Sequence, residues 1–393
     1  MARTEIKPGV FWVGGIDWDL RSFHGYSTNR GSTYNAYLIM DEKVVLVDTV
    51  KHYLFDEMRA RIEEIVEPSR IDYIVSNHVE MDHSGSLEKM QRLAPNARVL
   101  TSAMGEKGLL RHFKGLNLQV VKNGETLNIG KRTLAFHYVP MVHWPDSMVT
   151  YVPEEKLLMP NDAFGQHIAS SERYDDQLDW GILKEEAAKY YANIVMPYGD
   201  QVKAALGAIS GLQIDMIAPS HGMIWRSRIP DILKEYGKWC TYQTEKRALI
   251  VYDTMWGSTE KVAHSLKSGL EDAGVPVSVK RLSVTDMSDI VTELLTTRLV
   301  LVGSPTLNNG MLPTVGAFLT YIKGLKPRQR IGMTFGSFGW GGQAVGEIEG
   351  IMKAMGWELP EKGLNFKFVP TEEELAQARQ TGRRLGEHLK TTT

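Results

Sequence analysis

The last part of the chain alternates short apolar runs with amphipathic segments, and this alternation restricts the possible folds more than any other feature. Four runs after Lys246 are predicted to be strands: 248–252, 277–279, 299–302 and 331–335. Between the first two, residues 259–274 carry apolar side chains at helical spacing and end at Gly274. Mostly apolar strands separated by helices are typical of βαβ units. We therefore expect an α/β fold with a doubly wound parallel sheet over 246–393.

The first 245 residues show a different pattern, in which hairpins and helices are mixed. The runs 33–40 and 43–49 flank Asp41-Glu42, which indicates a hairpin. Further strands are expected at 72–76, 99–102, 133–138 and 148–152, and helices at 54–65, 182–196 and 201–209. This mixture favours helices packed on sheets over a purely parallel sheet. A chain of 393 residues is long enough for two domains, which we place at 1–245 and 246–393.

Composition and charge exclude several classes of protein. The formal net charge is −2, no stretch approaches about 18 consecutive apolar residues, and the N-terminus lacks the apolar segment of a signal peptide. We therefore expect neither a nucleic-acid partner nor a membrane partner, and a cytoplasmic location. Cys240 is the single cysteine, so the chain can form neither an intrachain disulfide nor a cysteine-held iron centre. Any redox chemistry has to use another cofactor.

A loop rich in metal-ligating side chains follows the expected strand 72–76. It holds four candidate ligands within six residues: His78, Glu80, Asp82 and His83. Side chains two apart in an extended loop project to the same side, so His78 and Glu80 can share one ion. Asp82 and His83, after a local turn, can bind a second ion. A solvated acidic loop explains any one of these residues but not the cluster, because imidazoles and carboxylates are the usual ligands of divalent metals.

Three more candidate ligands lie in loops that follow apolar runs: His143, Asp162 and His221. Such loops are where sheet-built sites place their ligands. Each of the three, taken alone, can equally be a hydrogen-bonded structural residue. Combined with the histidine-rich loop, they resemble the ligand set of the metallo-β-lactamase fold, which implies an αββα domain.

Hydrolases of that fold usually carry histidine at the position of Glu80. A carboxylate there favours iron over zinc. The resemblance implies two metal ions bridged by Asp162, with the other ligands divided as His78, Glu80 and His143 for one ion and Asp82, His83 and His221 for the other. Two histidines and one carboxylate with open positions is the ligand set of oxygen-reactive non-haem iron.

Three loops at the carboxyl ends of strands in the second domain predict a phosphate-bearing cofactor. Hydroxyls and backbone N–H groups at a helix N-terminus can cradle a phosphate. The first loop lacks the motifs of triphosphate and dinucleotide sites, and taken alone it can be a plain helix cap. Together the loops resemble those of flavodoxin, which implies FMN held by Thr254, Met255, Trp256, Gly257, Ser258, Thr259, Ser304, Pro305, Thr306, Leu307, Asn308, Asn309, Ser337, Phe338, Gly339, Trp340, Gly341 and Gly342. Trp256 and Trp340 are candidates to flank the flat ring.

The two domains together resemble the flavodiiron proteins, also called A-type flavoproteins, over essentially the whole chain. The stretches 143–147, 162–166 and 190–193 are family-like. The resemblance implies an oxidoreductase that reduces dioxygen to water, nitric oxide to nitrous oxide, or both, at two non-haem irons supplied with electrons by FMN. It also implies a head-to-tail homodimer or a dimer of dimers. His24 and Tyr191 are candidates to donate a proton or hydrogen bond to substrate, although each can equally be a packed residue.

One cysteine cannot supply an internal iron–thiolate relay, so we expect an external electron donor, either a rubredoxin or a reduced deazaflavin. An alternative function is a zinc-dependent hydrolase of the glyoxalase or lactamase type with a fused flavodoxin module. Metal analysis separates these two functions. A third alternative is an electron-transfer module whose metal site is only structural. Rapid oxidation of the reduced protein by dioxygen or nitric oxide would exclude it.

Overall fold

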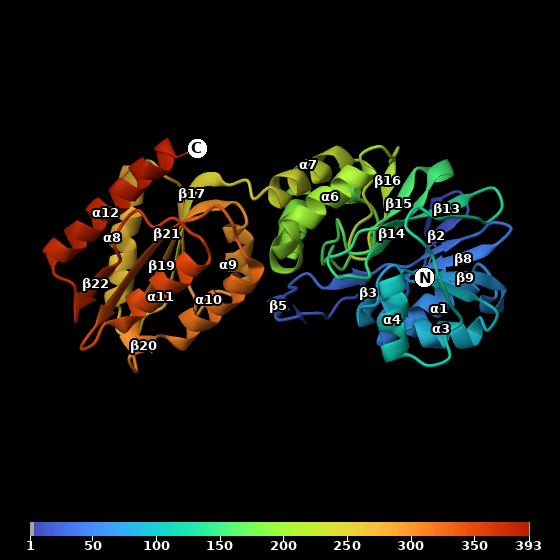
Figure 1. The fold of residues 1–393 in the computed structure, drawn as a ribbon, viewed down its shortest axis with the longest axis horizontal. Helices are drawn as coiled ribbons and strands as arrows, with labels where there is room; N and C mark the ends of the chain where they lie inside the picture. The colour runs from blue at the N-terminus through green and yellow to red at the C-terminus, as the bar shows by residue number, and fades with distance from the viewer. Residues whose placement is uncertain (1–3, 393) are drawn as a thin grey trace. The chain divides into compact units, whose positions relative to one another are not determined.

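The structure is a computed structural model that describes residues 4–392 and divides into two compact units. The first unit contains the residues up to Tyr190 together with Asp200–Gly237, and the second contains Tyr191–Gly199 and the residues from Lys238 onward. Figure 1 shows the chain coloured from blue to red along its length. The predicted domains include residues 1–3 and 393, which lie outside the described residues. Their boundary after Glu245 stays a prediction.

The first unit is built on two sheets. The larger sheet has the order β1-β2-β7-β8-β9-β10-β11, and the smaller has the order β12-β13-β14-β15-β16. The strands of the larger sheet are β1 (Thr4–Lys7), β2 (Val10–Trp12), β7 (Tyr37–Ile39), β8 (Val44–Val47), β9 (Ile71–Val75), β10 (Arg98–Thr101) and β11 (Leu118–Val120). Those of the smaller sheet are β12 (Thr126–Asn128), β13 (Thr133–Tyr138), β14 (Met148–Val152), β15 (Leu157–Met159) and β16 (Met216–Ile217). Two short ribbons pair β3 (Gly15–Asp17) with β6 (Ser32–Tyr34) and β4 (Ser22–Phe23) with β5 (Tyr26–Ser27).

Side-chain alternation along the strands builds two apolar layers in this unit. Val45 and Val47 of β8 face a core shared with Phe136 of the smaller sheet, whereas Leu46 faces a core shared with Met58 of a helix. The helices of the unit are α1 (Phe55–Glu63), α2 (Met81–Ser84), α3 (Leu87–Leu93), α4 (Ala103–His112), α5 (Trp180–Tyr190), α6 (Gly199–Ile209) and α7 (Ile229–Cys240). Helices on the outside of two packed sheets confirm the predicted metallo-β-lactamase-like αββα architecture.

The predicted strand 33–40 is wrong, because the structure divides this run into β6 and β7. The break occurs at Asn35, whose buried side chain accepts a hydrogen bond from Trp12 Nε1 and donates to the carbonyls of Pro219 and Gly222. The Asn35 N–H also donates to the Ser220 carbonyl. These bonds replace sheet pairing at this position, and they attach a distant loop to the larger sheet.

The second unit contains one sheet in which β18, β17, β19, β21 and β22 are parallel neighbours in that order. This is the 2-1-3-4-5 order of flavodoxin-like sheets, and it confirms the predicted doubly wound fold. The strands are β17 (Glu245–Tyr252), β18 (Val277–Arg281), β19 (Thr297–Leu307), β20 (Gly310–Met311), β21 (Ile331–Phe338) and β22 (Leu364–Lys367). The short β20 pairs with the end of β19.

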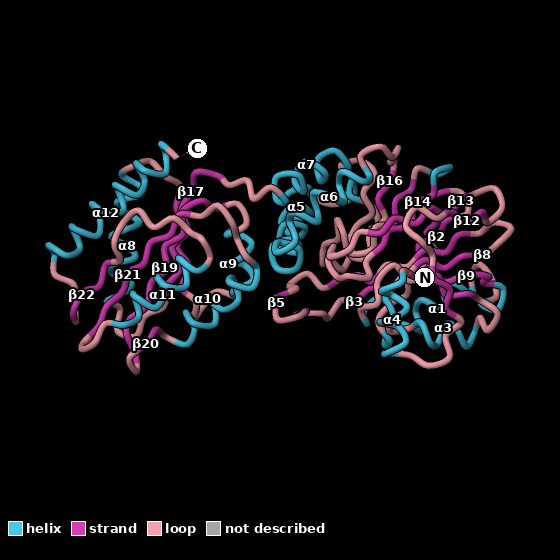
Figure 2. Tube along the Cα trace, viewed as in Figure 1, coloured by secondary structure: helices cyan, strands magenta, loops and turns pink. Residues whose placement is uncertain are grey.

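Helices cover both faces of this sheet, as Figure 2 shows. They are α8 (Ser258–Asp272), α9 (Met287–Leu294), α10 (Pro313–Leu325), α11 (Gln343–Ala354) and α12 (Glu372–Thr391). Residues Tyr191–Val195 form a π-helical turn that belongs to this unit, where Asn193 accepts a hydrogen bond from Tyr321 and donates to the Ser288 carbonyl. The predicted helix 182–196 therefore ends early, at Tyr190.

Candidate metal centre and cofactor pocket

Four loops bring the seven predicted metal ligands together at one edge of the first unit. The first loop follows β9, and the others follow β13, β15 and β16. These last three strands run in the same direction, so their ends meet at one edge of the smaller sheet. Every one of the seven residues is at most 8% exposed: His78, Glu80, Asp82, His83, His143, Asp162 and His221. The structure therefore brings the predicted set together, and the role of these residues as metal ligands stays a prediction.

The seven side chains form two groups. Potential ligand atoms of His78, Glu80, His143 and Asp162 lie within 4.8 Å of one another, as do those of Asp82, His83 and His221. In the first group, Glu80 Oε2 lies 3.2 Å from the Nε2 atoms of both histidines. In the second group, Asp82 Oδ2 lies 3.2 Å from His221 Nε2, and Asp82 Oδ1 lies 3.4 Å from His83 Nε2. This is the division that the family resemblance implied.

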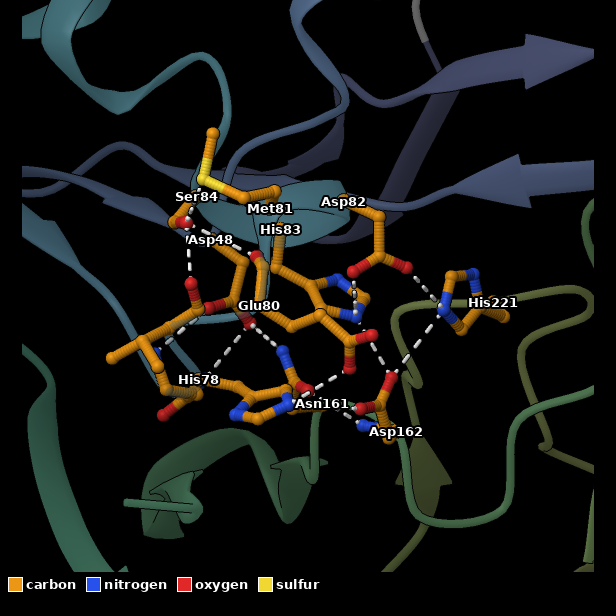
Figure 3. Close-up of polar contacts among 12 residues, drawn as sticks. Asp48, His78, Glu80, Met81, Asp82, His83, Ser84, Asn161, Asp162 and His221 are labelled. Atoms are coloured by element: carbon orange, nitrogen blue, oxygen red, sulfur yellow. Dashed lines mark hydrogen bonds and ion pairs between the residues drawn. The ribbon is translucent and has the colours of Figure 1, made fainter. Parts of the chain in front are cut away.

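Asp162 faces both groups with different oxygens. Its Oδ1 lies 2.8 Å from His83 Nε2 and 3.3 Å from His221 Nε2. Its Oδ2 lies 3.1 Å from His143 Nε2 and 3.6 Å from His78 Nε2. Figure 3 shows Asp82, Asp162 and His221 turned toward one another. A carboxylate that presents one oxygen to each group is placed to bridge two ions.

Opposite charges concentrated in a buried place shift the pKa values of the cluster. Burial lowers the pKa of His143 and His221, but the nearby carboxylates outweigh burial and raise these values to about 9 and about 10. Burial raises the pKa of Asp162 and Glu80, but the surrounding imidazoles outweigh it and hold both below their usual range. These two carboxylates therefore stay anionic, as metal ligands must.

Several buried atoms of the cluster have no hydrogen-bond partner among residues 4–392. They are both carboxylate oxygens of Asp82, Oδ1 of Asp162, both ring nitrogens of His83 and Nε2 of His221. Leaving such atoms unpaired is costly inside a protein. Carboxylate oxygens and imidazole nitrogens that converge in a buried place are the ligand atoms of divalent cations, and the share of carboxylates favours iron.

Neighbouring groups fix the orientation of two of the rings. Asp146 Oδ2 accepts hydrogen bonds from His78 Nδ1 at 2.9 Å and from the Val79 N–H at 2.8 Å. The Thr33 carbonyl accepts from His221 Nδ1 at 2.9 Å. When Nδ1 is held in this way, Nε2 points at the other members of the cluster and keeps its lone pair for a metal.

Replacing the orienting carboxylate should weaken metal binding without removing a ligand. We expect Asp146→Ala to lower iron affinity by roughly 10- to 100-fold, because His78 loses the acceptor that fixes its ring. Asp146→Asn should lose less iron affinity, because its amide oxygen can accept the same hydrogen bond from His78 Nδ1. Competition with a chelator, followed by iron analysis, measures the difference. Unchanged affinity in Asp146→Ala would show that Asp146 does not orient the ligand.

His24 contacts the first group directly. Its Nε2 hydrogen-bonds to Glu80 Oε1, although 56% of the His24 side chain is exposed. The hydrogen bond to Glu80 outweighs partial burial and raises the pKa of His24. The structure therefore places this predicted residue between solvent and the cluster.

Tyr191 has different surroundings. Its ring packs against Trp239 in the second unit, with 5.2 Å between centroids. The preceding Tyr190 is the residue whose ring lies near the cluster, 5.9 Å from the ring of His221. The role predicted for Tyr191 stays a prediction, and the ring contact with His221 favours Tyr190 for this role.

Two further residues near the cluster were absent from the sequence prediction. Lys51 places its Nζ 5.0 Å from the ring centroid of Phe23 and 4.9 Å from that of Tyr34, and burial lowers its pKa more than the nearby carboxylates raise it. His167 is buried, its Nδ1 lies 2.6 Å from Ser32 Oγ, and its ring lies 4.6 Å from that of His221. His167 directly follows the family-like stretch 162–166, so its position in that loop is the sequence signal that points to it.

The second unit contains a pocket of about 640 Å³ at the carboxyl ends of its strands. The predicted residues that line it are Thr254, Met255, Trp256, Ser258, Pro305, Thr306, Leu307, Asn308, Asn309, Ser337, Phe338, Gly339 and Trp340. Trp256 and Trp340 are 94% and 83% exposed, so these large apolar surfaces are available to a ligand. Pockets beyond the carboxyl ends of strands are where open α/β sheets bind ligands.

Five predicted residues shape the loops instead of lining the pocket: Gly257, Thr259, Ser304, Gly341 and Gly342. Gly257 and Gly342 precede α8 and α11 with φ of +82° and +106°, values that favour glycine. The Thr259 and Ser337 hydroxyls hydrogen-bond at 2.9 Å, and Ser304 Oγ accepts from the Leu312 N–H at 2.9 Å.

The sequence prediction also missed two lining residues, Phe368 and Val369, which follow β22. They belong to a fourth loop at the same edge of the sheet. The rule that placed the first three loops, ligand contacts after strand ends, would have found this loop if β22 had been predicted.

Comparison with known proteins assigns both units. Residues 33–222 match the ODP family beta lactamase, and residues 250–382 match flavodoxin. None of the helices in the described part of the chain combines the length and apolar character needed to cross a bilayer.

Three relatives extend over nearly the whole chain. A nitric oxide reductase of Moorella thermoacetica is 46% identical over 98% of both chains. The structure of rubredoxin oxygen:oxidoreductase from Desulfovibrio gigas is 40% identical with a TM-score of 0.97, and 99% of each chain is covered. That of the flavodiiron protein from Giardia intestinalis is 36% identical with the same TM-score, covering 99% of this chain and 97% of that one. The αββα unit, the flavodoxin-like unit and these full-length similarities show that the chain belongs to the flavodiiron proteins.

Proposed function

We propose that this chain reduces dioxygen to water, nitric oxide to nitrous oxide, or both, with two irons in the first unit and FMN in the second. The observation that carries the proposal is the pair of buried ligand groups that share Asp162. The names of the relatives, a nitric oxide reductase and a rubredoxin oxygen:oxidoreductase, support the same chemistry. They give no support to the alternative of a zinc-dependent hydrolase, since both named activities are redox reactions.

The seven-residue cluster would hold the irons. His78, Glu80 and His143 would bind one iron and Asp82, His83 and His221 the other, with Asp162 between them. When bound, the irons supply open coordination positions and Lewis acidity. Asp146 and the Thr33 carbonyl keep two of the rings in the binding orientation. His24 is placed to pass a proton from solvent to substrate held at the cluster, because its Nε2 contacts Glu80 while 56% of its side chain is exposed.

Lys51 would add a positive charge beside the same site. Its ammonium group is held over the rings of Phe23 and Tyr34, and the carboxylates of Asp82 and Glu80 act on it electrostatically. A cation fixed there attracts electron density that develops on a nearby substrate oxygen. Both proposed reductions put negative charge on oxygen, so this placement supports the redox function.

In the second unit, the pocket at the strand ends would hold FMN. Ser258 and the backbone N–H groups at the start of α8 would bind the phosphate. Trp256 and Trp340 would lie against the flavin ring. The proposal includes an external electron donor, either a rubredoxin or a reduced deazaflavin. It also includes assembly as a head-to-tail homodimer or a dimer of dimers, and a cytoplasmic location. The name of the relative from Desulfovibrio gigas supports a rubredoxin donor.

Composition and turnover of the purified protein test this function together. We expect two irons and one acid-extractable FMN per chain, and rapid oxidation of the anaerobically reduced protein by dioxygen, by nitric oxide with release of nitrous oxide, or by both. Zinc in place of iron with esterase activity would establish the hydrolase instead. Iron and FMN without oxidation by either gas would leave only an electron-transfer role.

A further inference from the structure

A small apolar pocket lies between the outer face of the smaller sheet and α6 in the first unit. Its cavity volume, measured for a water-sized molecule, is about 20 Å³. Alternation along the strands turns Val149 of β14 and Leu158 of β15 outward, while Met148 and Leu157 face the core between the sheets. The space remains open because α6 presents the short side chain of Ala205 to it.

The pocket is placed directly behind two of the proposed metal-ligand loops. Val142, which lines it, precedes His143, and Ala163, which also lines it, follows Asp162. Both neighbours belong to the first ligand group. Ala163 and Ala205 are partly exposed, whereas Val142 is 5% exposed, so the lining runs from the surface to the back of the ligand loops.

Water is a poor occupant of this pocket. The lining side chains are apolar except for Tyr236, and the Tyr236 hydroxyl already accepts a hydrogen bond of 2.7 Å from the Phe164 N–H. A buried water needs two to four polar partners, and apolar cavities of sufficient size stay dry and take up apolar gases such as xenon. The open space exceeds the roughly 10 to 15 Å³ that one water-sized molecule requires.

We propose that this pocket is a binding site for one small uncharged diatomic molecule, dioxygen or nitric oxide, on its way to the metal centre. The assignment of these gases rests on the proposed function, whereas the affinity of the pocket for an apolar gas rests on its lining alone. An apolar gas gains free energy by leaving water for a dry apolar space. Occupancy here would hold the gas against Val142 and Ala163, the sequence neighbours of His143 and Asp162.

Xenon is the probe that tests binding without turnover. Crystals of the complete holoprotein, pressurised with xenon, should show one xenon atom between α6 and the smaller sheet. Ala205→Leu should remove it by filling the space. Ala204→Leu is the matched control, because Ala204 is the preceding residue of α6 and is exposed, so this variant should keep the xenon. Absence of xenon from the pocket of the unmodified holoprotein would overturn the proposal.

Gas kinetics provide the second measurement. Ala205→Leu should raise the KM for the gas by roughly threefold to tenfold, as expected when a small apolar contact is lost, and leave kcat at saturating gas and the iron content unchanged. Ala204→Leu should match the unmodified protein. An unchanged KM in an Ala205→Leu variant that has lost the xenon would contradict the role in gas delivery. A protein that binds xenon but reduces neither gas would refute the proposed function and leave the apolar gas site standing.

Discussion

Asp162→Ala is expected to lower the iron content from two per chain to below one and to reduce gas turnover at least about 100-fold. Loss of a residue that only orients a metal ligand already costs roughly 10- to 100-fold in affinity. Asp162 faces both groups, with its two oxygens 2.8 to 3.6 Å from four imidazole nitrogens. Its removal therefore weakens the binding of both ions, whereas loss of Glu80 or Asp82 removes a carboxylate from one group only.

The flavin should be unaffected by Asp162→Ala, because its proposed pocket is lined entirely by residues of the second unit. Asp176→Ala is the control, since Asp176 is an exposed carboxylate whose partner is Arg226 at 3.0 Å. Metal analysis, flavin extraction and gas uptake are measured on the unmodified protein and on the two variants. Two irons with full turnover in Asp162→Ala would remove this residue from the metal site.

Ser258→Asp is expected to weaken FMN binding by at least roughly 100-fold. Position 258 begins α8 and lines the pocket, where the phosphate would approach the helix N-terminus. A carboxylate there would face the phosphate at close range, and like charges a few ångströms apart near a protein surface repel by several kcal/mol. The same substitution places an acidic side chain at a helix N-terminus, which stabilises the helix, so the unit should remain folded.

Two other variants isolate the effect of charge at position 258. Ser258→Ala removes the hydroxyl without adding charge and should retain most of the binding. Ser268→Asp adds the same charge ten residues further along α8, outside the residues that line the pocket, and should bind FMN normally. Titration of the flavin-free protein by fluorescence quenching measures all three. Normal FMN affinity in Ser258→Asp would place the phosphate elsewhere.

Local sequence patterns predicted the strands and loops whose structure depends on residues adjacent in the sequence. The strands expected at 133–138 and 148–152 have those bounds in the structure, and the four-ligand loop follows β9 as expected. Apolar alternation and strand-end loops are properties of short segments, so they can be seen in one sequence. The division of the run 33–40 could not be predicted in this way, because the hydrogen bonds that replace sheet pairing at Asn35 are made with Pro219 and Gly222.

The residues that surround the metal ligands were harder to predict for the same reason. Lys51 is near the cluster because its ammonium group rests on Phe23 and Tyr34, which belong to other segments. Tyr190 and Tyr191 are adjacent and chemically identical, so the sequence does not distinguish them, whereas the structure places the ring of Tyr190 5.9 Å from that of His221. The ligands themselves were predictable, because four histidine and carboxylate side chains within six residues are seldom found outside metal sites.

The bonds of Asn35 also bear on when the metal centre can form during folding. Its side chain is bonded to carbonyls 184 and 187 positions further along the chain, on either side of His221. Contacts between such distant positions carry a high loop-closure entropy and form slowly. During synthesis, the loop that carries His221 can be fixed only after residue 222 has left the ribosome. The complete ligand set is thus a late product of folding, because His221 takes its place only after these long-range bonds have formed.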